Sequence, residues 1–367
     1  MVQAVRSSRV VRLSFLTLGV AALAGAGLLA GGSPGHGPQV SAAVLTAGTR
    51  HGAARPAGAA RRAAGTLPLA GALPVKDMAS ASRLPRPLHG VARYLRTRHG
   101  VAQVALFNKL TGRTYLLSGG RNTQYTASIV KADIMSLWLW RYQSRPGIIP
   151  DSMPYSIRYL LQNMITMSDN VAATSLFYFS GGCTTLTLFN TLIPTRHTVV
   201  ACETPTYYGW GNTTTTAKDQ VAIVRTLAYR NATLARDARE YGLHLMESVE
   251  PTQRWGITCG PWGTKCAAPD YATPDPDVTV ALKNGWKYLP TCAKQDDSCP
   301  WQVNSIGWVR GKGRNYVLAV LTTDDPAGPG TAGLDYGIST IQGVSQRIWA
   351  NLAAGRRPLD RRHRARS

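Results

Sequence analysis

Acidic residues, histidine and closely spaced cysteines are all scarce in this chain. Its 367 residues include 19 Asp and Glu against 41 Lys and Arg, which gives a formal net charge of +22. The seven histidines are scattered, and no two cysteines have the C-x-x-C spacing typical of zinc sites. His197 and His244 are isolated, so we expect no catalytic dyad based on histidine. We therefore expect a protein without a metal ion or cofactor.

The positive charge is concentrated at the two ends of the chain. Residues 1–86 carry a net charge of +9 and residues 356–367 carry +5, which leaves about +8 for the core. Both tails are rich in small residues and arginine and lack hydrophobic periodicity. They are predicted to be disordered arms that are attracted to anionic cell-wall polymers or to membrane surfaces. The moderate charge of the core does not indicate a nucleic-acid partner.

A long apolar run occurs near the N-terminus. Leu13–Ala30 follows Arg6, Arg9 and Arg12, the order of a positive region and a hydrophobic region in an export signal. We expect residues 1–30 to be a signal peptide, with an uncleaved membrane anchor as the alternative. The protein is thus expected to be secreted. No cysteine precedes Cys183, which excludes a lipid-anchored cysteine at the cleavage site.

Six cysteines, an even number in a chain expected to be exported, favour disulfide bonds. Neighbours in the sequence suggest the pairs Cys183–Cys202, Cys259–Cys266 and Cys292–Cys299. Six cysteines allow 15 connectivities, and spacing alone does not choose among them.

Hydrophobic patterning predicts one monomeric domain over residues 89–353, after a linker over 31–88 and before a basic tail over 354–367. The expected strands are 101–108, 114–117, 277–283, 301–310 and 315–322. One helix is expected directly after residue 128, and further helices are expected at 155–179, 217–229, 234–249 and 334–353. The first of these ranges is expected to break at 168–170. Between them, the cysteine-bounded segment near residues 183–202 is expected to be irregular. This order predicts an α/β sandwich around one antiparallel sheet.

A serine and a lysine stand three residues apart in Ser128-Ile-Val-Lys131. On a helix, this spacing places both side chains on one side, one turn apart, so that the amine can take the proton of the hydroxyl. Thr126 suits a helix N-cap, which would put Ser128 among the unpaired N–H groups of the first turn. The alternative is an exposed helix pair without a role in catalysis.

Three motifs follow in a fixed order: Ser128-Ile-Val-Lys131, Ser168-Asp169-Asn170 and Lys283-Asn284-Gly285. They resemble the S-x-x-K, S-D-N and K-T-G set of class A β-lactamases and penicillin-binding proteins. Three further segments resemble actinobacterial secreted serine hydrolases of this superfamily: Gln253-Arg-Trp-Gly256, Asn284-Gly-Trp286 and Asn304-Ser-Ile-Gly-Trp308. The resemblance implies a five-stranded antiparallel sheet with a helical subdomain.

The resemblance also implies a role for each motif residue in acyl transfer. Ser128 is the nucleophile, Lys131 the base, and Ser168 the residue that passes a proton to the leaving nitrogen. Lys283 supplies positive charge from the facing strand. The substrate contacts are expected at Asn170, Asn284, Gly285 and Trp286, and the backbone N–H groups of Ser128 and Trp286 form the oxyanion hole. Without catalysis, Ser168 and Asn170 would only terminate helices and Lys283 would only protect a strand edge.

Two departures from the family pattern affect the expected function. Asn284 stands where threonine is usual, which puts the identity of the substrate in question. The E-x-x-L-N loop of class A enzymes is missing, and Glu203 is the acidic candidate for activating the deacylating water. We therefore expect a serine hydrolase that acts on β-lactams or related amides. The alternatives are a D-Ala-D-Ala peptidase or penicillin-binding protein with slow deacylation, and a catalytically impaired module that binds the cell wall.

Overall fold

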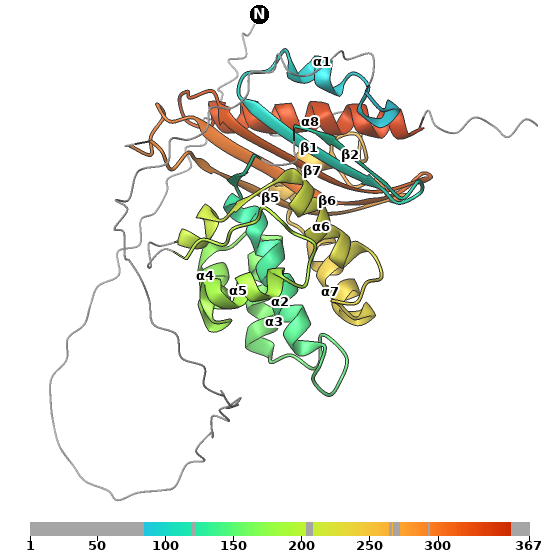
Figure 1. Ribbon diagram of the computed structural model, residues 1–367, viewed down its shortest axis with the longest axis vertical. Helices are drawn as coiled ribbons and strands as arrows, with labels where there is room; N and C mark the ends of the chain where they lie inside the picture. The colour runs from blue at the N-terminus through green and yellow to red at the C-terminus, as the bar shows by residue number, and fades with distance from the viewer. Residues whose placement is uncertain are drawn as a thin grey trace, which may run out of the picture. The chain divides into compact units, whose positions relative to one another are not determined.

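A five-stranded antiparallel sheet forms the centre of the fold (Figure 1). The computed structural model describes residues 84–118, 122–202, 208–263, 266, 272–292 and 294–353. The strands are ordered β2-β1-β7-β6-β5. Their bounds are β1 Val101–Asn108, β2 Arg113–Leu117, β5 Val278–Tyr288, β6 Trp301–Gly311 and β7 Arg314–Asp325. Strand β5, which carries Lys283, is therefore an edge strand.

Helices cover both faces of the sheet (Figure 1). Helix α8 (Ala332–Ala353) packs on β6 and β7, and the short helix α1 (Val91–Leu95) packs on α8. The other face is covered by α6 (Ala217–Ala228) and the rest of the helical subdomain. Those remaining helices are α2 Val130–Tyr142, α3 Tyr155–Thr166, α4 Asn170–Phe179, α5 Gly182–Asn190 and α7 Arg236–Glu247. Within the described residues we find no helix with the length and apolarity that a membrane span requires.

The strands are apolar on both faces because both faces are covered. On β7, Val317, Ala319 and Leu321 join the hydrophobic cluster on the helical-subdomain side. The alternate residues Leu318 and Val320 join the cluster under α8. The same period of two on β5 directs odd-numbered residues from 281 onward toward the helical subdomain and even-numbered residues toward α8.

The predicted fold class is confirmed, and β1 has the bounds that its sequence pattern predicts. Strand β5 continues to Tyr288, beyond the predicted end of the strand at Lys283. Two further differences concern local structure. The cysteine-bounded segment contains a regular helix, α5, whose Leu186 and Phe189 are buried in the core. The described fold also includes the 3-10 turn η3 (Arg86–Leu88) with Leu88 fully buried, within the segment whose composition predicts a linker.

The three cysteine pairs of sequence neighbours are disulfide bonds: Cys183–Cys202, Cys259–Cys266 and Cys292–Cys299. The first connects the start of α5 to the segment that leads toward the site, and the third closes the loop between β5 and β6. Disulfides are typical of proteins that fold in an oxidising compartment outside the cytoplasm.

Candidate active site

Ser128 lies in a 3-10 turn, η4 (Ala127–Ile129), which leads directly into α2. Ala127 has a φ of 47°, in the left-handed region that residues with a side chain seldom adopt. Thr126 stands at the N-cap position of η4, as predicted, but it has helical backbone angles and its side chain makes no capping hydrogen bond. Ser128 is only half-buried, whereas most of α2 is buried. The serine is thus accessible at the start of a rigid central helix.

Two buried amides on β6 fix the backbone that precedes this turn. Asn304 Nδ2 donates to the carbonyl oxygens of Tyr125 (3.0 Å) and Thr126 (2.9 Å). Gln302 Nε2 donates to the same Tyr125 oxygen at 2.7 Å. Both amide side chains are fully buried. The sheet therefore determines the position of the strained turn at Ala127, and these residues were not part of the predicted site.

Lys131 is fully buried and directs its ammonium group at the turn between α3 and α4. Its Nζ donates to the Ser168 carbonyl oxygen (2.6 Å), to Ser168 Oγ (3.2 Å) and to Asn170 Oδ1 (2.7 Å). Ser168 has a φ of 60° and Asp169 caps α4 by accepting from the Ala172 N–H. The turn thus presents both the backbone and the side chain of Ser168 to the lysine.

Lys283 reaches the same hydroxyl from the opposite side of the site. Its Nζ donates to Ser168 Oγ at 2.8 Å and to the carbonyl oxygen of Asn284 at 2.8 Å. Only 1 % of Lys283 is exposed. One serine hydroxyl therefore lies between two buried lysines, one from α2 and one from β5.

Burial changes the protonation of both lysines. It lowers the pKa of Lys131 to about 7, against the opposing effect of the Asp169 carboxylate. Burial, and then the positive charge of Lys131, lower the pKa of Lys283 well below its usual value. Near neutral pH this pair can hold or release a proton next to Ser168, as acid–base chemistry requires.

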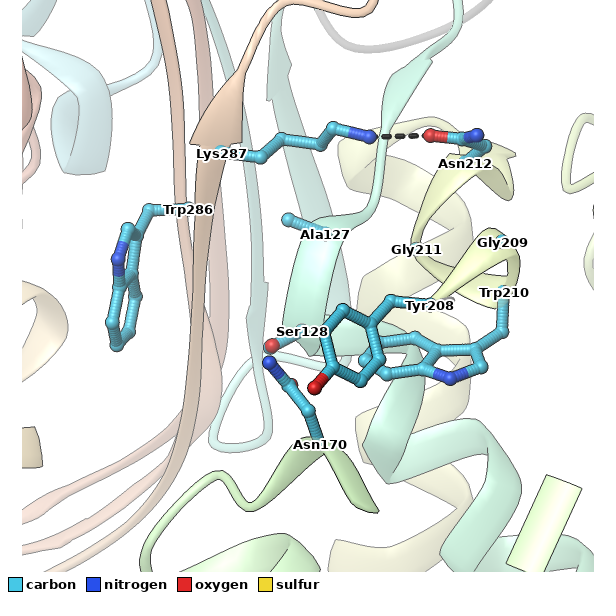
Figure 2. A pocket seen from close by; sticks show the side chains of 10 residues that line it. All are labelled: Ala127, Ser128, Asn170, Tyr208, Gly209, Trp210, Gly211, Asn212, Trp286 and Lys287. Carbon is cyan, nitrogen blue, oxygen red and sulfur yellow. Dashed lines mark hydrogen bonds between the residues drawn. The ribbon is translucent and has the colours of Figure 1, made fainter. Parts of the chain in front are cut away.

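The two faces of β5 divide the remaining motif residues. Gly285 faces η4, whereas Asn284 is buried on the opposite face and its Nδ2 donates to the Gln253 carbonyl oxygen at 2.8 Å. The Trp286 indole packs against Trp255 with ring centres 5.7 Å apart, and Figure 2 shows it pointing away from Ser128. The predicted substrate contact through the Asn284 amide is thus not part of this arrangement. Trp286 borders the site through its position on the strand.

A cavity of about 270 Å³ opens beside Ser128 (Figure 2). Its walls come from η4, from β5, from the start of α4 and from the segment around the 3-10 turn η5 (Gly209–Asn212). Trp210 forms one wall, and Lys131 Nζ lies 4.9 Å from the centre of its ring system. The lining residues are Ala127, Ser128, Asn170, Tyr208, Gly209, Trp210, Gly211, Asn212, Trp286 and Lys287.

The structure therefore brings seven predicted residues together, including Gly285 against η4 and Trp286 at the border of the cavity, and the sequence prediction missed others. Ser128 and Asn170 line the cavity, while Lys131, Ser168 and Lys283 form the hydrogen-bonded cluster beside it. The missed residues are Tyr208, Trp210, Asn212, Lys287, Gln302 and Asn304. The alternation of glycine and aromatic residues at 208–211, and the period of two from Lys283 to Lys287, could have indicated three of them, Tyr208, Trp210 and Lys287. Glu203 lies outside the described residues.

Comparison with known proteins identifies the family of this chain. Residues 141–352, more than half of the chain, match the model of the beta-lactamase enzyme family. The chain belongs to this family. The matched residues include Ser168 and Lys283, whereas Ser128 and Lys131 precede them.

Solved structures of β-lactamases share the fold. A variant of the enzyme of the last common ancestor of Gram-negative bacteria has a TM-score of 0.55 at 19 % identity, over 74 % of this chain and all of that one. A Xanthomonas campestris β-lactamase has a TM-score of 0.53 at 17 % identity, over 71 % and 96 % of the two chains. A class A β-lactamase from Mycobacterium abscessus has a TM-score of 0.52 at 19 % identity, over 72 % of this chain and 98 % of that one. No curated protein sequence is significantly similar.

Proposed function

We propose that this protein is an exported serine hydrolase in which Ser128 forms an acyl-enzyme with β-lactams or with related amides of cell-wall peptides. The observation that carries the proposal is the convergence of Lys131 and Lys283 on Ser168 Oγ, at 3.2 and 2.8 Å, beside the cavity that Ser128 lines. Acyl transfer needs a nucleophile, a group that takes its proton and a route for that proton to the leaving nitrogen.

In the proposed acylation, Ser128 Oγ attacks the carbonyl carbon and its proton passes to neutral Lys131. The lowered pKa of Lys131, about 7, supports this role near neutral pH. When the carbon–nitrogen bond breaks, Ser168 donates its hydroxyl proton to the leaving nitrogen. Ser168 then recovers a proton from the lysine pair with which it is hydrogen-bonded. The backbone N–H groups of Ser128 and Trp286 are proposed to stabilise the oxyanion.

Deacylation determines which of two functions the site performs. Water must attack the Ser128 ester, and a carboxylate that activates this water gives fast turnover. None of the described residues that line the cavity is acidic, and Glu203 is the candidate from the sequence. With Glu203 as base, the protein is a β-lactamase. Without a base, the acyl-enzyme persists and the protein is a penicillin-binding peptidase.

The proposed site of action is outside the cytoplasm. The basic segment before Leu13–Ala30, together with three disulfides, supports export. The basic tails support attraction to anionic cell-wall polymers or a membrane surface. Such attraction would concentrate the hydrolase where cell-wall peptides occur.

An intact-mass time course with benzylpenicillin tests the proposal. We expect an adduct with the mass of the penicillin on the purified protein and none on Ser128→Ala. The matched control is Ser144→Ala, which alters an exposed serine just after α2 and is expected to react as wild type does. If no adduct forms and no penicillin is hydrolysed, the proposal is wrong. A longer-lived adduct on Glu203→Gln identifies Glu203 as the base, and an unchanged lifetime removes it from the mechanism.

A further inference from the structure

Strand β5 carries a second lysine on the face that meets the nucleophile. Because side chains alternate along a strand, Lys283, Gly285 and Lys287 share the face toward the helical subdomain. Gly285 lies against the backbone of Ser128, and Lys283 is bonded to Ser168. Lys287 is two residues beyond Gly285, which places its Cα about 7 Å further along the strand. It thus lies on the opposite side of Gly285 from the Ser168 cluster.

The cavity extends from the nucleophile to this lysine. Figure 2 shows Ser128 and Asn170 at one end and the Lys287 side chain crossing the other end toward Asn212. Lys287 Nζ donates to Asn212 Oδ1 and lies 5.5 Å from the centre of the Tyr125 ring. Among the described residues that line the cavity, Lys287 is the one with a charged side chain. The cavity is therefore chemically asymmetric, with the reactive hydroxyl at one end and a cation at the other.

An acyl group bound to Ser128 can extend into this cavity. A carboxylate on that group could take the place of the Asn212 amide oxygen at Lys287 Nζ. An ammonium group bonds a carboxylate more strongly than it bonds a neutral amide oxygen. An uncharged substituent of the same length cannot form this ionic hydrogen bond with Lys287 and so gains no binding energy at this position.

From this geometry we infer that Lys287 determines acyl-group specificity: it selects substrates whose acyl side chain carries a carboxylate several atoms from the reacting carbonyl. The inference rests on the proposed acylation of Ser128 and adds the substrate class to it. Among cell-wall peptides, it favours donors with an acidic side chain near the acylating residue.

Two penicillins that differ in one group test the inference. Adipoyl-6-aminopenicillanic acid ends its acyl chain in a carboxylate, and hexanoyl-6-aminopenicillanic acid ends a chain of the same length in a methyl group. The second-order rate constant of acylation is measured for each by intact mass, on the full protein. The ratio of the adipoyl to the hexanoyl rate constant is the readout, because a general loss of activity cancels in it.

We expect the wild-type ratio to be about 10 or more, the size of effect that a hydrogen bond between charged groups gives. Lys287→Met keeps the chain length without the charge and is expected to lower the ratio to about 1, and this readout does not depend on how much the individual rate constants change. Lys287→Arg keeps the cation and is expected to retain most of the preference. The control Lys109→Met removes an exposed lysine of the β1–β2 turn and leaves the ratio unchanged.

The outcomes separate this inference from the proposed function. If both penicillins acylate the wild type but the ratio is near 1, or if Lys287→Met keeps the wild-type ratio, the role of Lys287 is wrong and the acyl-enzyme stands. If neither penicillin forms an adduct with the wild type and neither is hydrolysed, the proposed function fails, and the inference fails with it. Acylation of Lys287→Met by the hexanoyl compound shows that the variant is folded.

Discussion

Gly285 and Ser128 are in backbone contact across the site. A Cβ atom at Gly285 would lie 2.7 Å from the backbone nitrogen of Ser128 and at the same distance from that of Ile129. Cβ atoms do not approach backbone nitrogen so closely, so a side chain at Gly285 must displace β5 from η4. The close approach of β5 to the Ser128 backbone is therefore possible because residue 285 is a glycine without a Cβ atom.

Gly285→Ala is expected to slow acylation by about 10- to 100-fold, because displacements of the order of 1 Å disturb the alignment of reacting atoms. The intact-mass assay with benzylpenicillin measures the rate. Circular dichroism and the melting temperature report whether the fold survives. A folded variant with the wild-type acylation rate would show that the contact does not position Ser128.

Asp169→Asn is expected to move the pH dependence of acylation toward lower pH. The Asp169 carboxylate raises the pKa of Lys131, which burial lowers to about 7. Since the neutral amine of Lys131 is the proposed base, the wild-type rate should rise with pH through about 7, and removal of the carboxylate should lower this midpoint. Asparagine caps helices as well as aspartate does, so α4 should keep its start.

Acylation rates measured from pH 5 to 9 test this expectation. Asp151→Asn is the control, because Asp151 is exposed and lies before α3. A midpoint that is unchanged in Asp169→Asn, or equally shifted in the control, would mean that Asp169 does not influence the base.

Asp133→Asn is expected to make stability less dependent on pH. Burial raises the pKa of Asp133 to about 7, against the effect of its hydrogen bond from Asn190. The folded state therefore holds a proton that the unfolded state releases above its ordinary pKa of 3.8. Its contribution to stability is present at low pH and is lost as the pH rises through about 7.

Between pH 5 and pH 8, the unfolding free energy of the wild type should fall relative to that of Asp133→Asn by roughly 2–4 kcal/mol. Urea denaturation at the two pH values measures the difference. Asp297→Asn, which alters an exposed carboxylate, should behave as wild type does. The same pH dependence in wild type and Asp133→Asn would show that Asp133 titrates as an exposed carboxyl group does.

Removal of a disulfide should lower the free energy of unfolding more when the disulfide closes the longer loop. Cys183 and Cys202 are 19 residues apart, and Cys292 and Cys299 are 7 apart. Each disulfide lowers the chain entropy of the unfolded state, so its removal lowers the unfolding free energy. The expected decrease is about 3 kcal/mol for the Cys183→Ser/Cys202→Ser variant and about 2 kcal/mol for Cys292→Ser/Cys299→Ser. Urea denaturation under oxidising conditions compares them. The reverse order would show that strain or packing outweighs loop closure.

Periodicity predicted the elements whose side chains meet a core in a regular pattern. The alternating strands and the order of strands and helices were predictable for this reason. Helix α5 was missed because its sequence begins Gly182-Cys-Thr-Thr, residues with weak helix propensity. Burial of Leu186 and Phe189 stabilises it in the fold, a contribution that local sequence does not show.

The residues of the candidate site that lie within the three short motifs were predictable from the sequence. Ser128, Lys131, Ser168 and Lys283 are close together because each motif keeps its own local geometry. Asn284 was placed by analogy with a motif threonine, although the period of two along β5 already separates it from Lys283. The roles of Asn304 and Lys287 depend on contacts with Tyr125 and Asn212 that are far away in the sequence.

The Ser168 hydroxyl bonds a lysine 37 residues before it and another 115 residues after it. Contacts over such distances along the chain form only after the sheet has closed against the helical subdomain. On the proposed function, a chain exported in the unfolded state would therefore carry an ordinary serine at position 128, and this serine would become reactive only when folding is complete. The rate at which a refolding chain becomes able to form the covalent adduct with a penicillin would then report the rate of the last step of folding.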